Sequence, residues 1–134
     1  ITLDILTPQG AKRSGVEVPG VEVPGIAGEL GILPDHVPFI TPIIPGVVRF
    51  RDGESSERLA VGSGFLEVSA EGRVSILTER ALKASEIDLV AVNERLRAVN
   101  VELEREAGRN VASVHRRLVD EGRGLEAQMR VGAG

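Results

Sequence analysis

The side chains best suited to acid–base chemistry gather in one short segment, Gly28-Glu29-Leu30-Gly31-Ile32-Leu33-Pro34-Asp35-His36-Val37-Pro38. Glu29 supplies a carboxylate and His36 an imidazole, the two groups that general acid–base catalysis uses most often. The glycines allow backbone angles closed to other residues, and the prolines fix φ. We therefore expect a shaped loop that holds both side chains, although a plain turn between two strands is the simpler interpretation.

A complete catalytic centre cannot be assembled around these groups. His36 and His115 are the only histidines, they fall in different halves of the chain, and there is no cysteine. A hydrolase triad needs a nucleophile beside a base, and a zinc site needs three or four nitrogen or sulfur ligands. Ser63 lies in Gly62-Ser63-Gly64, which lacks the full G-x-S-x-G frame of a nucleophile elbow. We expect no catalytic residue, no metal and no cofactor.

The composition excludes two further classes of partner. The 134 residues carry a formal charge of -4, without a basic run, and include three Phe, no Trp and no Tyr. A nucleic-acid binding surface would need basic residues for the phosphates and aromatic side chains for stacking. No apolar run approaches the roughly 20 residues that span a bilayer, and no signal peptide is visible. Membrane association is therefore expected only through a partner protein.

The hydrophobic pattern changes near residue 85. Up to that point apolar and polar residues alternate in short runs, such as Leu3-Asp4-Ile5, and turn signals occur at Asp52-Gly53 and Glu71-Gly72. Asp-Gly is a favoured two-residue hairpin turn, and short evenly spaced strands indicate a sandwich or barrel. The predicted fold class is an all-β sandwich over 1–84 followed by an antiparallel α-helical hairpin over 85–134, a two-domain β plus α chain.

Two helices are predicted after the change of period. Ser85 is a favourable N-cap, acids follow in the first turn, and Gly108 is expected to end the first helix. Apolar residues three and four apart form one stripe on each helix, and the two stripes are expected to face each other. The first stripe is Leu89, Val92, Leu96, Val99 and Leu103, and the second is Val111, Val114, Leu118, Leu125 and Met129.

A short internal repeat precedes the loop with Glu29. Val16-Glu17-Val18-Pro19-Gly20 is followed directly by Val21-Glu22-Val23-Pro24-Gly25. Ten residues are too few for a repeat architecture. Because proline cannot donate to a strand ladder, a bulge or an edge-strand break is expected at Pro19-Gly20.

Five pieces of the first half occur in the order and spacing typical of one protein family. They are Leu6-Thr7-Pro8, Pro24-Gly25, the segment 28–38, Pro45-Gly46-Val47-Val48-Arg49 and Gly62-Ser63-Gly64-Phe65-Leu66-Glu67-Val68. On these residues the chain resembles the epsilon subunit of bacterial F-type ATP synthases. Pro19-Gly20 departs from that pattern, because the family has an uninterrupted strand there.

The resemblance implies a non-catalytic rotor subunit that couples proton flow to ATP synthesis. The sandwich would bind the gamma subunit and lie on the c-ring, with contacts from Glu29, Gly31 and His36. The simpler roles are a solvated acid for Glu29 and a loop histidine bonded to the backbone for His36. The resemblance also implies a peripheral location on the cytoplasmic face of the bacterial inner membrane, with an organellar equivalent left open.

The helices would inhibit ATP hydrolysis by reaching the catalytic alpha/beta head. Residues 105–134 hold six Arg and four acids, a bias that by default describes a solvated helix face. By resemblance the inhibitory basic face would be Arg116, Arg117, Arg123 and Arg130. Gly122 and Gly124 would weaken the second helix by about 1 kcal/mol each.

Some members of that family bind ATP through an I-D-x-x-R-A motif. Ile87 and Asp88 match its first two positions, but Ala91 stands where the arginine would be, so the bidentate phosphate partner is missing. Ile87 as a core residue and Asp88 as a first-turn acid are the competing interpretations. Two other function classes stay open: a nucleotide sensor that acts through the helices, and a small-ligand module that uses a pocket near Glu29 and His36.

Overall fold

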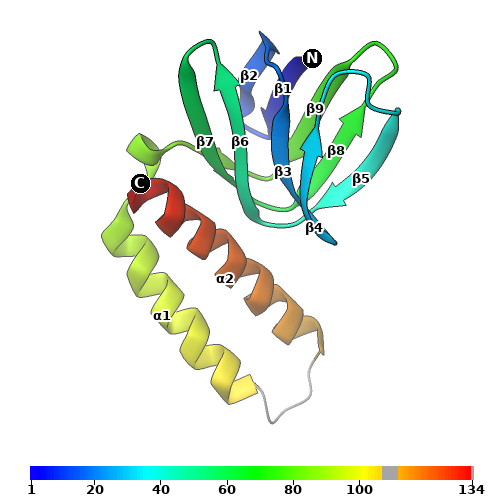
Figure 1. Ribbon diagram of the computed structural model, residues 1–134. Coiled ribbons are helices and arrows are strands. Elements are labelled where there is room, and N and C mark those ends of the chain that lie inside the picture. The colour runs from blue at the N-terminus through cyan, green and yellow to red at the C-terminus, as the bar shows by residue number, and fades with distance from the viewer. Residues whose placement is uncertain (107–111, 134) are drawn as a thin grey trace.

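The computed structural model describes residues 1–106 and 112–133. Figure 1 shows a β-domain with two long helices beneath it. The predicted β plus α fold class is confirmed. Two α-helices follow the strands and a short 3-10 helix, η1 (Ala84–Glu86): α1 (Leu89–Glu106) and α2 (Ala112–Ala133). The strands are β1 (Thr2–Thr7), β2 (Gly10–Glu17), β3 (Val21–Gly25), β4 (Gly28–Ile32), β5 (Phe39–Ile43), β6 (Gly46–Asp52), β7 (Ser55–Val61), β8 (Gly64–Val68), β9 (Arg73–Thr78) and β10 (Ala81–Leu82).

All ten strands belong to one sheet that folds over on itself. The order is β10-β7-β6-β3-β5-β8-β9-β1-β2, and β4 pairs with β3 outside this path. Among the strands of the described residues, only β1 and β9 pair in parallel. The bend falls between β3 and β5, which share the single pair Gly25↔Ile43. The two layers on either side of the bend form the sandwich.

The core between the layers consists almost entirely of aliphatic side chains. Leu3, Ile5, Val23, Val48 and Ile76 have no exposed surface, and Phe50 is the aromatic residue buried among them. Burial of each such side chain contributes about 1.5–3 kcal/mol. The expected alternation over Leu3-Asp4-Ile5 is wrong at one position, because Asp4 is only 5% exposed.

A bulge in β2 explains the buried Asp4. Leu3 pairs with Val16 and Ile5 with Arg13, so Ser14 and Gly15 both lie opposite Asp4. Gly15 has φ +63 and donates its N–H to Asp4 Oδ1 at 2.8 Å. Arg73 Nε lies 2.8 Å from the other carboxylate oxygen. The carboxylate therefore has the partners that a buried charge requires.

The β6–β7 hairpin turns one residue later than predicted. Its paired residues are Asp52 and Ser55, so the two-residue loop is Gly53-Glu54, with Gly53 at φ +64. The predicted hairpin around Gly72 is present between β8 and β9. The repeat 16–25 contains the expected strand break, since β2 ends at Glu17 and β3 begins at Val21.

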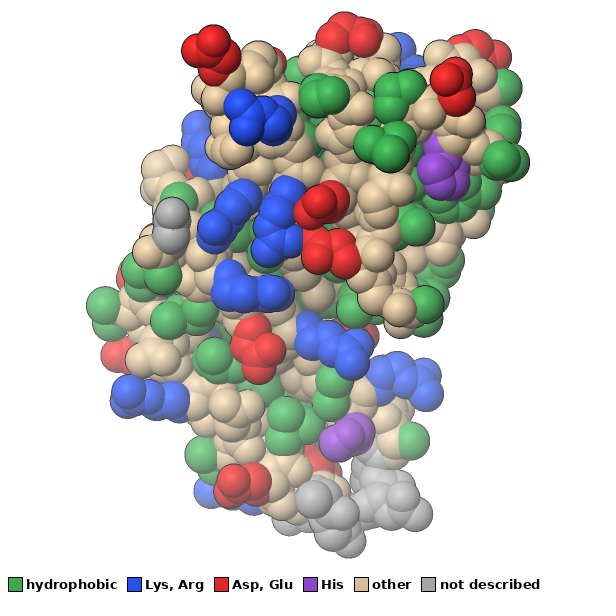
Figure 2. Space-filling view, in the orientation of Figure 1, with side chains coloured by type: hydrophobic (Ala, Val, Ile, Leu, Met, Phe, Trp, Pro, Cys, Tyr) green, Lys and Arg blue, Asp and Glu red, His purple; other side chains and the backbone are tan. Residues whose placement is uncertain are grey.

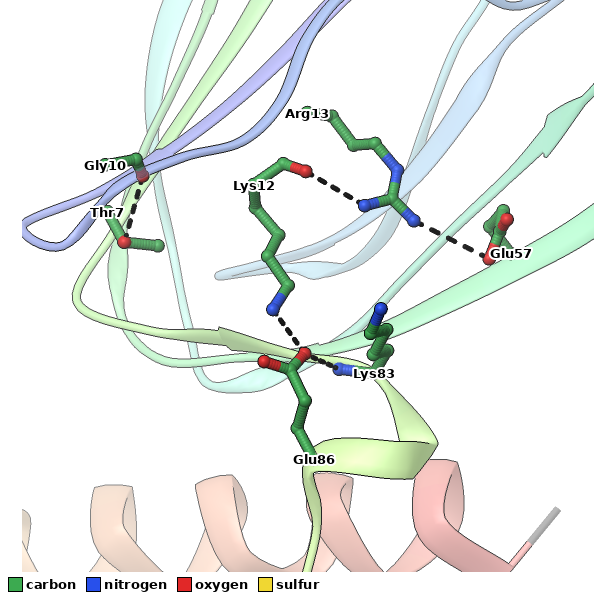
Figure 3. A network of polar contacts seen from close by, with 7 residues as sticks. All are labelled: Thr7, Gly10, Lys12, Arg13, Glu57, Lys83 and Glu86. Atoms are coloured by element: carbon green, nitrogen blue, oxygen red, sulfur yellow. Dashed lines mark hydrogen bonds and ion pairs between the residues drawn. The ribbon is translucent and has the colours of Figure 1, made fainter.

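Ion pairs connect the free end of the sheet to the linker that leads to the helices (Figure 3). Arg13 on β2, the last strand of the path, pairs at 3.8 Å with Glu57 on β7, the second strand of the path. Lys12 donates to the carboxylate of Glu86 in η1, and the backbone N–H of Lys83 donates to the same oxygen at 3.1 Å. These bonds lower the pKa of Glu86, with Lys12 the larger cause.

The predicted N-cap of the first helix is wrong. Ser85 lies inside η1, and α1 begins at Leu89. Asp88 caps α1 instead, since its Oδ1 accepts the N–H groups of Val90 and Ala91 at 3.1 and 3.2 Å. The predicted helix end at Gly108 and the core residue Val111 lie outside the described residues.

The two helices pack through the predicted apolar stripes. Val92 and Val99 of α1 form a buried cluster with Leu118 and Leu125 of α2, flanked by Leu96 and other partly buried residues. Arg95 joins the helices through a bidentate pair with Glu121, at 2.5 and 3.0 Å. This pair lowers the pKa of Glu121. Within the described residues, neither helix is long and apolar enough to cross a membrane.

We expect Gly64→Ala to destabilise the sandwich by about 3 kcal/mol or more, because overpacking against backbone cannot relax easily. A Cβ at Gly64 would overlap the backbone carbonyl of Leu77. Gly31→Ala is the matched control, since no atom of the described residues lies within 4 Å of the place its Cβ would take. Urea unfolding of both variants measures the difference, and equal stabilities would contradict this packing.

Asp4→Ala should lower the free energy of unfolding by about 2 kcal/mol, because the hydrogen bond from Gly15 to the charged carboxylate is worth about 1.5–3 kcal/mol, whereas the half-exposed Arg73 can bond to water instead. The substitution removes the acceptor for Arg73 and for the bulge N–H of Gly15. Glu71→Ala, an exposed acid in the β8–β9 turn, is the control. Denaturation curves that coincide for the two variants would show that the bulge does not need the carboxylate.

Candidate functional site: surfaces of the sandwich and the helices

Glu29 and Gly31 lie on β4, which pairs with β3 outside the main strand path. Glu29 pairs with Pro24 in the ladder and forms an ion pair with Arg49 on β6 at 2.5 Å, with half of its side chain exposed. Gly31 is exposed, and nothing in the described part of the chain lies within 4 Å of a Cβ position there. A larger side chain at position 31 would therefore begin without a clash against the described residues.

His36 comes after the C-terminal end of β4, in the loop 33–38 that leads to β5. Its Nδ1 is 3.1 Å from the carbonyl oxygen of Val37, and its ring centroid is 4.9 Å from that of Phe39. Asp35 before it has φ +66, a left-handed conformation unusual outside glycine. The loop is shaped as expected, but Glu29 and His36 stand at opposite ends of a strand and do not form one site.

An apolar row crosses the outer face of the layer that contains β5. Leu6 on β1 pairs with Leu77 on β9, Leu77 with Phe65 on β8, and Phe65 with Pro42 on β5. Phe65 and Leu77 are 55% and 45% exposed, and Ile40, two residues before Pro42, is 66% exposed. We call Leu6, Leu77, Phe65, Pro42 and Ile40 the outer stripe. Figure 2 shows hydrophobic side chains at the surface along the β5 side.

The helices are docked on the other layer through a small apolar contact. Val47 on β6 and Ala60 on β7 pack with Ala127 and Val131 of α2. We call these four residues the docking seam. Gly124 lies beside it, where a Cβ would meet Pro45 at 3.7 Å and the Arg80 guanidinium at 2.7 Å. The helix glycine therefore permits the close approach of α2, in addition to weakening the helix.

Two arginines of the sheet lie beside the docking seam. Arg49 and Arg58 are direct cross-strand partners on β6 and β7. Arg58 Nη2 donates to the carbonyl oxygen of Arg130, which belongs to the last turn of α2, where carbonyl groups lack partners within the helix. A cation at a helix C-terminus also interacts favourably with the helix dipole. Basic and acidic side chains are mixed over this face of the molecule (Figure 2).

The proposed basic face lies along α2 and is exposed in the docked state. Arg116, Arg123 and Arg130 are spaced seven residues apart, so they share one side of the helix, and Arg117 lies next to Arg116. Arg116 and Arg117 line a cleft of about 380 Å³ with Glu79, Arg80, Asp120 and Glu121. Arg123 and Arg130 line a second cleft of about 280 Å³, which reaches Glu29.

The two residues of the nucleotide motif have structural contacts in this chain. Ile87 packs against the docking seam and against the cluster between the helices. Asp88 caps α1. Arg95, the nearest arginine that could replace the missing one, pairs with Glu121. Within the described residues no group of three or more His, Asp or Glu side chains is arranged to hold a metal ion.

Sequence reasoning missed Arg49, Arg58 and Arg80. The turn predicted at Asp52-Gly53 would have placed Arg49 opposite Ser56, whereas the actual loop brings Arg58 opposite it. A hairpin predicted with Gly53-Glu54 as its loop would have placed the two arginines opposite each other. No sequence pattern indicated that Arg80 lies over the helix at Gly124.

Comparisons with known proteins agree with this architecture. A family model described as the ATP synthase delta/epsilon chain β-sandwich domain matches residues 1–84. The ATP synthase epsilon chain of Alkalihalophilus pseudofirmus is 40% identical over 89 residues, which span 66% of this chain and 65% of the relative. That of Moorella thermoacetica is 41% identical over 114 residues, or 84% of each chain.

Two solved structures share the fold. A chain from a Euglena gracilis mitochondrial ATP synthase structure with OSCP, F1 and c-ring superposes with a TM-score of 0.81 at 19% identity, covering 100% of this chain and 81% of that one. A chain from a Tetrahymena thermophila central stalk and c-ring structure gives 0.61 at 13% identity, covering 98% and 92%. On the family match and the Moorella relative, the chain belongs to the ATP synthase delta/epsilon family, among its epsilon chains.

Proposed function

We propose that this chain is a non-catalytic rotor subunit of an F-type ATP synthase, which transmits torque in the central stalk and limits ATP hydrolysis through its helices. The observation that carries the proposal is the match to curated epsilon chains over both parts of the chain, since 114 matched residues extend beyond the sandwich. The subunit would be peripheral, on the cytoplasmic face of a bacterial inner membrane, and would meet the membrane only through the complex.

The outer stripe is the surface proposed for the gamma subunit. It presents five apolar residues across four adjacent strands, with Phe65 at its centre. A row of exposed apolar side chains on a rigid sheet is typical of a protein interface, and aromatic residues are enriched in the centres of such interfaces. Its strand β5 directly follows the loop with His36, so the two would form one continuous contact area.

Glu29 and Gly31 are proposed to face the c-ring. Glu29 is half exposed on β4, and the open space around Gly31 leaves room for another backbone to approach closely. Because these residues and the outer stripe belong to different layers of the sheet, the sandwich could hold gamma and the c-ring at the same time.

The docked helices are proposed to permit rotation, and the undocked helices to inhibit hydrolysis at the alpha/beta head. The docking seam has two valines and two alanines, with Leu82 and Ile87 partly buried against it, so its hydrophobic contribution is only several kcal/mol. We call the helical part of the chain, 89–133, the arm. A partner that binds the undocked arm more tightly can then shift the population toward the undocked state. The exposed arginines of α2 would supply the contacts with the head.

Substitution of the outer stripe should release the chain from gamma. We expect Phe65→Glu combined with Leu77→Glu to abolish co-purification with the gamma subunit, because two charges would be buried without partners. Circular dichroism should show an intact fold, since both side chains are exposed. Val90→Glu, which adds charge at a 69% exposed site on α1, should leave co-purification unchanged. Retention of gamma by the double variant would place its binding surface elsewhere.

Removal of residues 89–134 should raise ATP hydrolysis by the assembled enzyme. This truncation keeps Glu86 with Lys12 and so preserves the linker contacts of the sandwich. Steady-state hydrolysis is compared with that of the full-length complex, after gel analysis shows that the truncated chain is retained. Hydrolysis rates that do not change would argue against inhibition by the helices while leaving the rotor role intact.

A further inference from the structure

Two arginines face each other beside the docking seam. Arg49 and Arg58 are directly opposite in the β6–β7 ladder, and like charges in that position repel. Each has a different partner: Arg49 pairs with Glu29 at 2.5 Å, and Arg58 donates to the carbonyl of Arg130 in α2. The contacts form a chain from β4 through the sheet to the end of α2.

This chain of contacts would make the docked helices sensitive to Glu29. While Glu29 neutralises Arg49, Arg58 can remain beside Arg49 and still cap the helix. If Glu29 takes another partner, the charge of Arg49 is less compensated, and Arg58 is held less favourably at the helix end. Glu22 of β3 is the other ladder partner of Arg49, so the loss of compensation is partial.

The space around these groups is open to a partner. A cleft of about 280 Å³ lies between the β3–β4 hairpin and α2, and its lining includes Glu29 as well as Arg123, Glu126 and Arg130 of the helix. A group that enters from the hairpin side would therefore reach Glu29 without first displacing the docking seam.

We propose that Glu29 controls docking of the helices through Arg49 and Arg58. The ligand that operates this control would be a basic or hydrogen-bond-donating group of a protein partner that takes the Glu29 carboxylate from Arg49. The regulatory purpose rests on the proposed function, in which Glu29 faces the rotor ring. The coupling itself is a property of this chain alone and can be measured without any partner.

The test uses the full chain and the reactivity of one introduced thiol. The natural sequence has no cysteine, and Ala127 in the docking seam is fully buried, so A127C reacts with a thiol reagent only when the arm undocks. Its labelling rate is compared in the A127C background alone and with Glu29→Gln, Arg58→Gln, Glu29→Gln plus Arg58→Gln, or Glu29→Gln plus Arg49→Gln. Glu71→Gln, which removes one exposed acid in the β8–β9 turn, is the charge-matched control.

Glu29→Gln should raise the labelling rate about 2- to 5-fold, the range expected for one cross-strand charge pair. Addition of Arg49→Gln should return the rate to that of the parent, since the uncompensated charge is then gone. Arg58→Gln should raise the rate and abolish any further effect of Glu29→Gln. Equal rates for Glu29→Gln and Glu71→Gln, or no rescue by Arg49→Gln, would overturn the proposal.

A second thiol separates undocking from global unfolding. V48C, at a fully buried position in the core of the sandwich, should label equally slowly with and without Glu29→Gln. If A127C fails to fold, A60C on the sheet side of the same seam gives the same readout. If the labelling rates show no coupling, the proposed rotor role still stands. If instead the assembled enzyme shows no gamma binding or c-ring contact, the labelling rates of the isolated chain are unaffected.

Discussion

The packing of the two helices on the sandwich depends on one constraint, the close approach of α2 to the sheet. Gly124 and Ala127 have little or no side chain at the contact, and they allow the helix backbone to lie against Pro45, Val47 and Ala60. A larger residue at Gly124 would meet the Arg80 guanidinium. Small residues let the helix backbone approach the sheet closely. Because they are small, they also bury little apolar area and so contribute little hydrophobic stabilisation.

The apolar contact between α2 and the sheet is small, so polar groups also contribute to docking. Arg58 at the end of α2 and Lys12 at Glu86 act at the two ends of the same region, one on the helix and one on the linker. Contacts of this kind on the surface are each worth about 1 kcal/mol or less. Their sum is smaller than the hydrophobic contribution of the seam, but in the proposed mechanism a partner that competes for these contacts would still shift the balance between docked and undocked helices.

The type and order of the elements could be predicted because they depend on local periodicity. Alternating residues and turn signals indicated the strands, and the spacing of Leu96, Val99 and Leu118 indicated two packed helices. The errors arose where a long-range contact outweighed a local preference. Asp4 is buried because a bulge in β2 and Arg73 supply its partners, and Asp88 rather than Ser85 caps α1 because η1 comes first.

The sequence allowed single residues of the candidate surfaces to be predicted, but not which of them lie together in the fold. Glu29 and His36 lie close in sequence but at opposite ends of β4, because an extended strand carries them apart by about 3.3 Å per residue. Arg49 and Arg58 lie far apart in sequence, yet the register of one hairpin places them face to face.

A turn shifted by one residue moves every cross-strand pair of its hairpin by two positions, and here that shift replaces a neutral neighbour of Arg49 with a second arginine. The pair is tolerated because each cation has its own counter-group, one on the strand that carries Glu29 and one on the helix. In the proposed coupling, the register of the β6–β7 hairpin is what connects β4 to the helices, because it places Arg58 opposite Arg49.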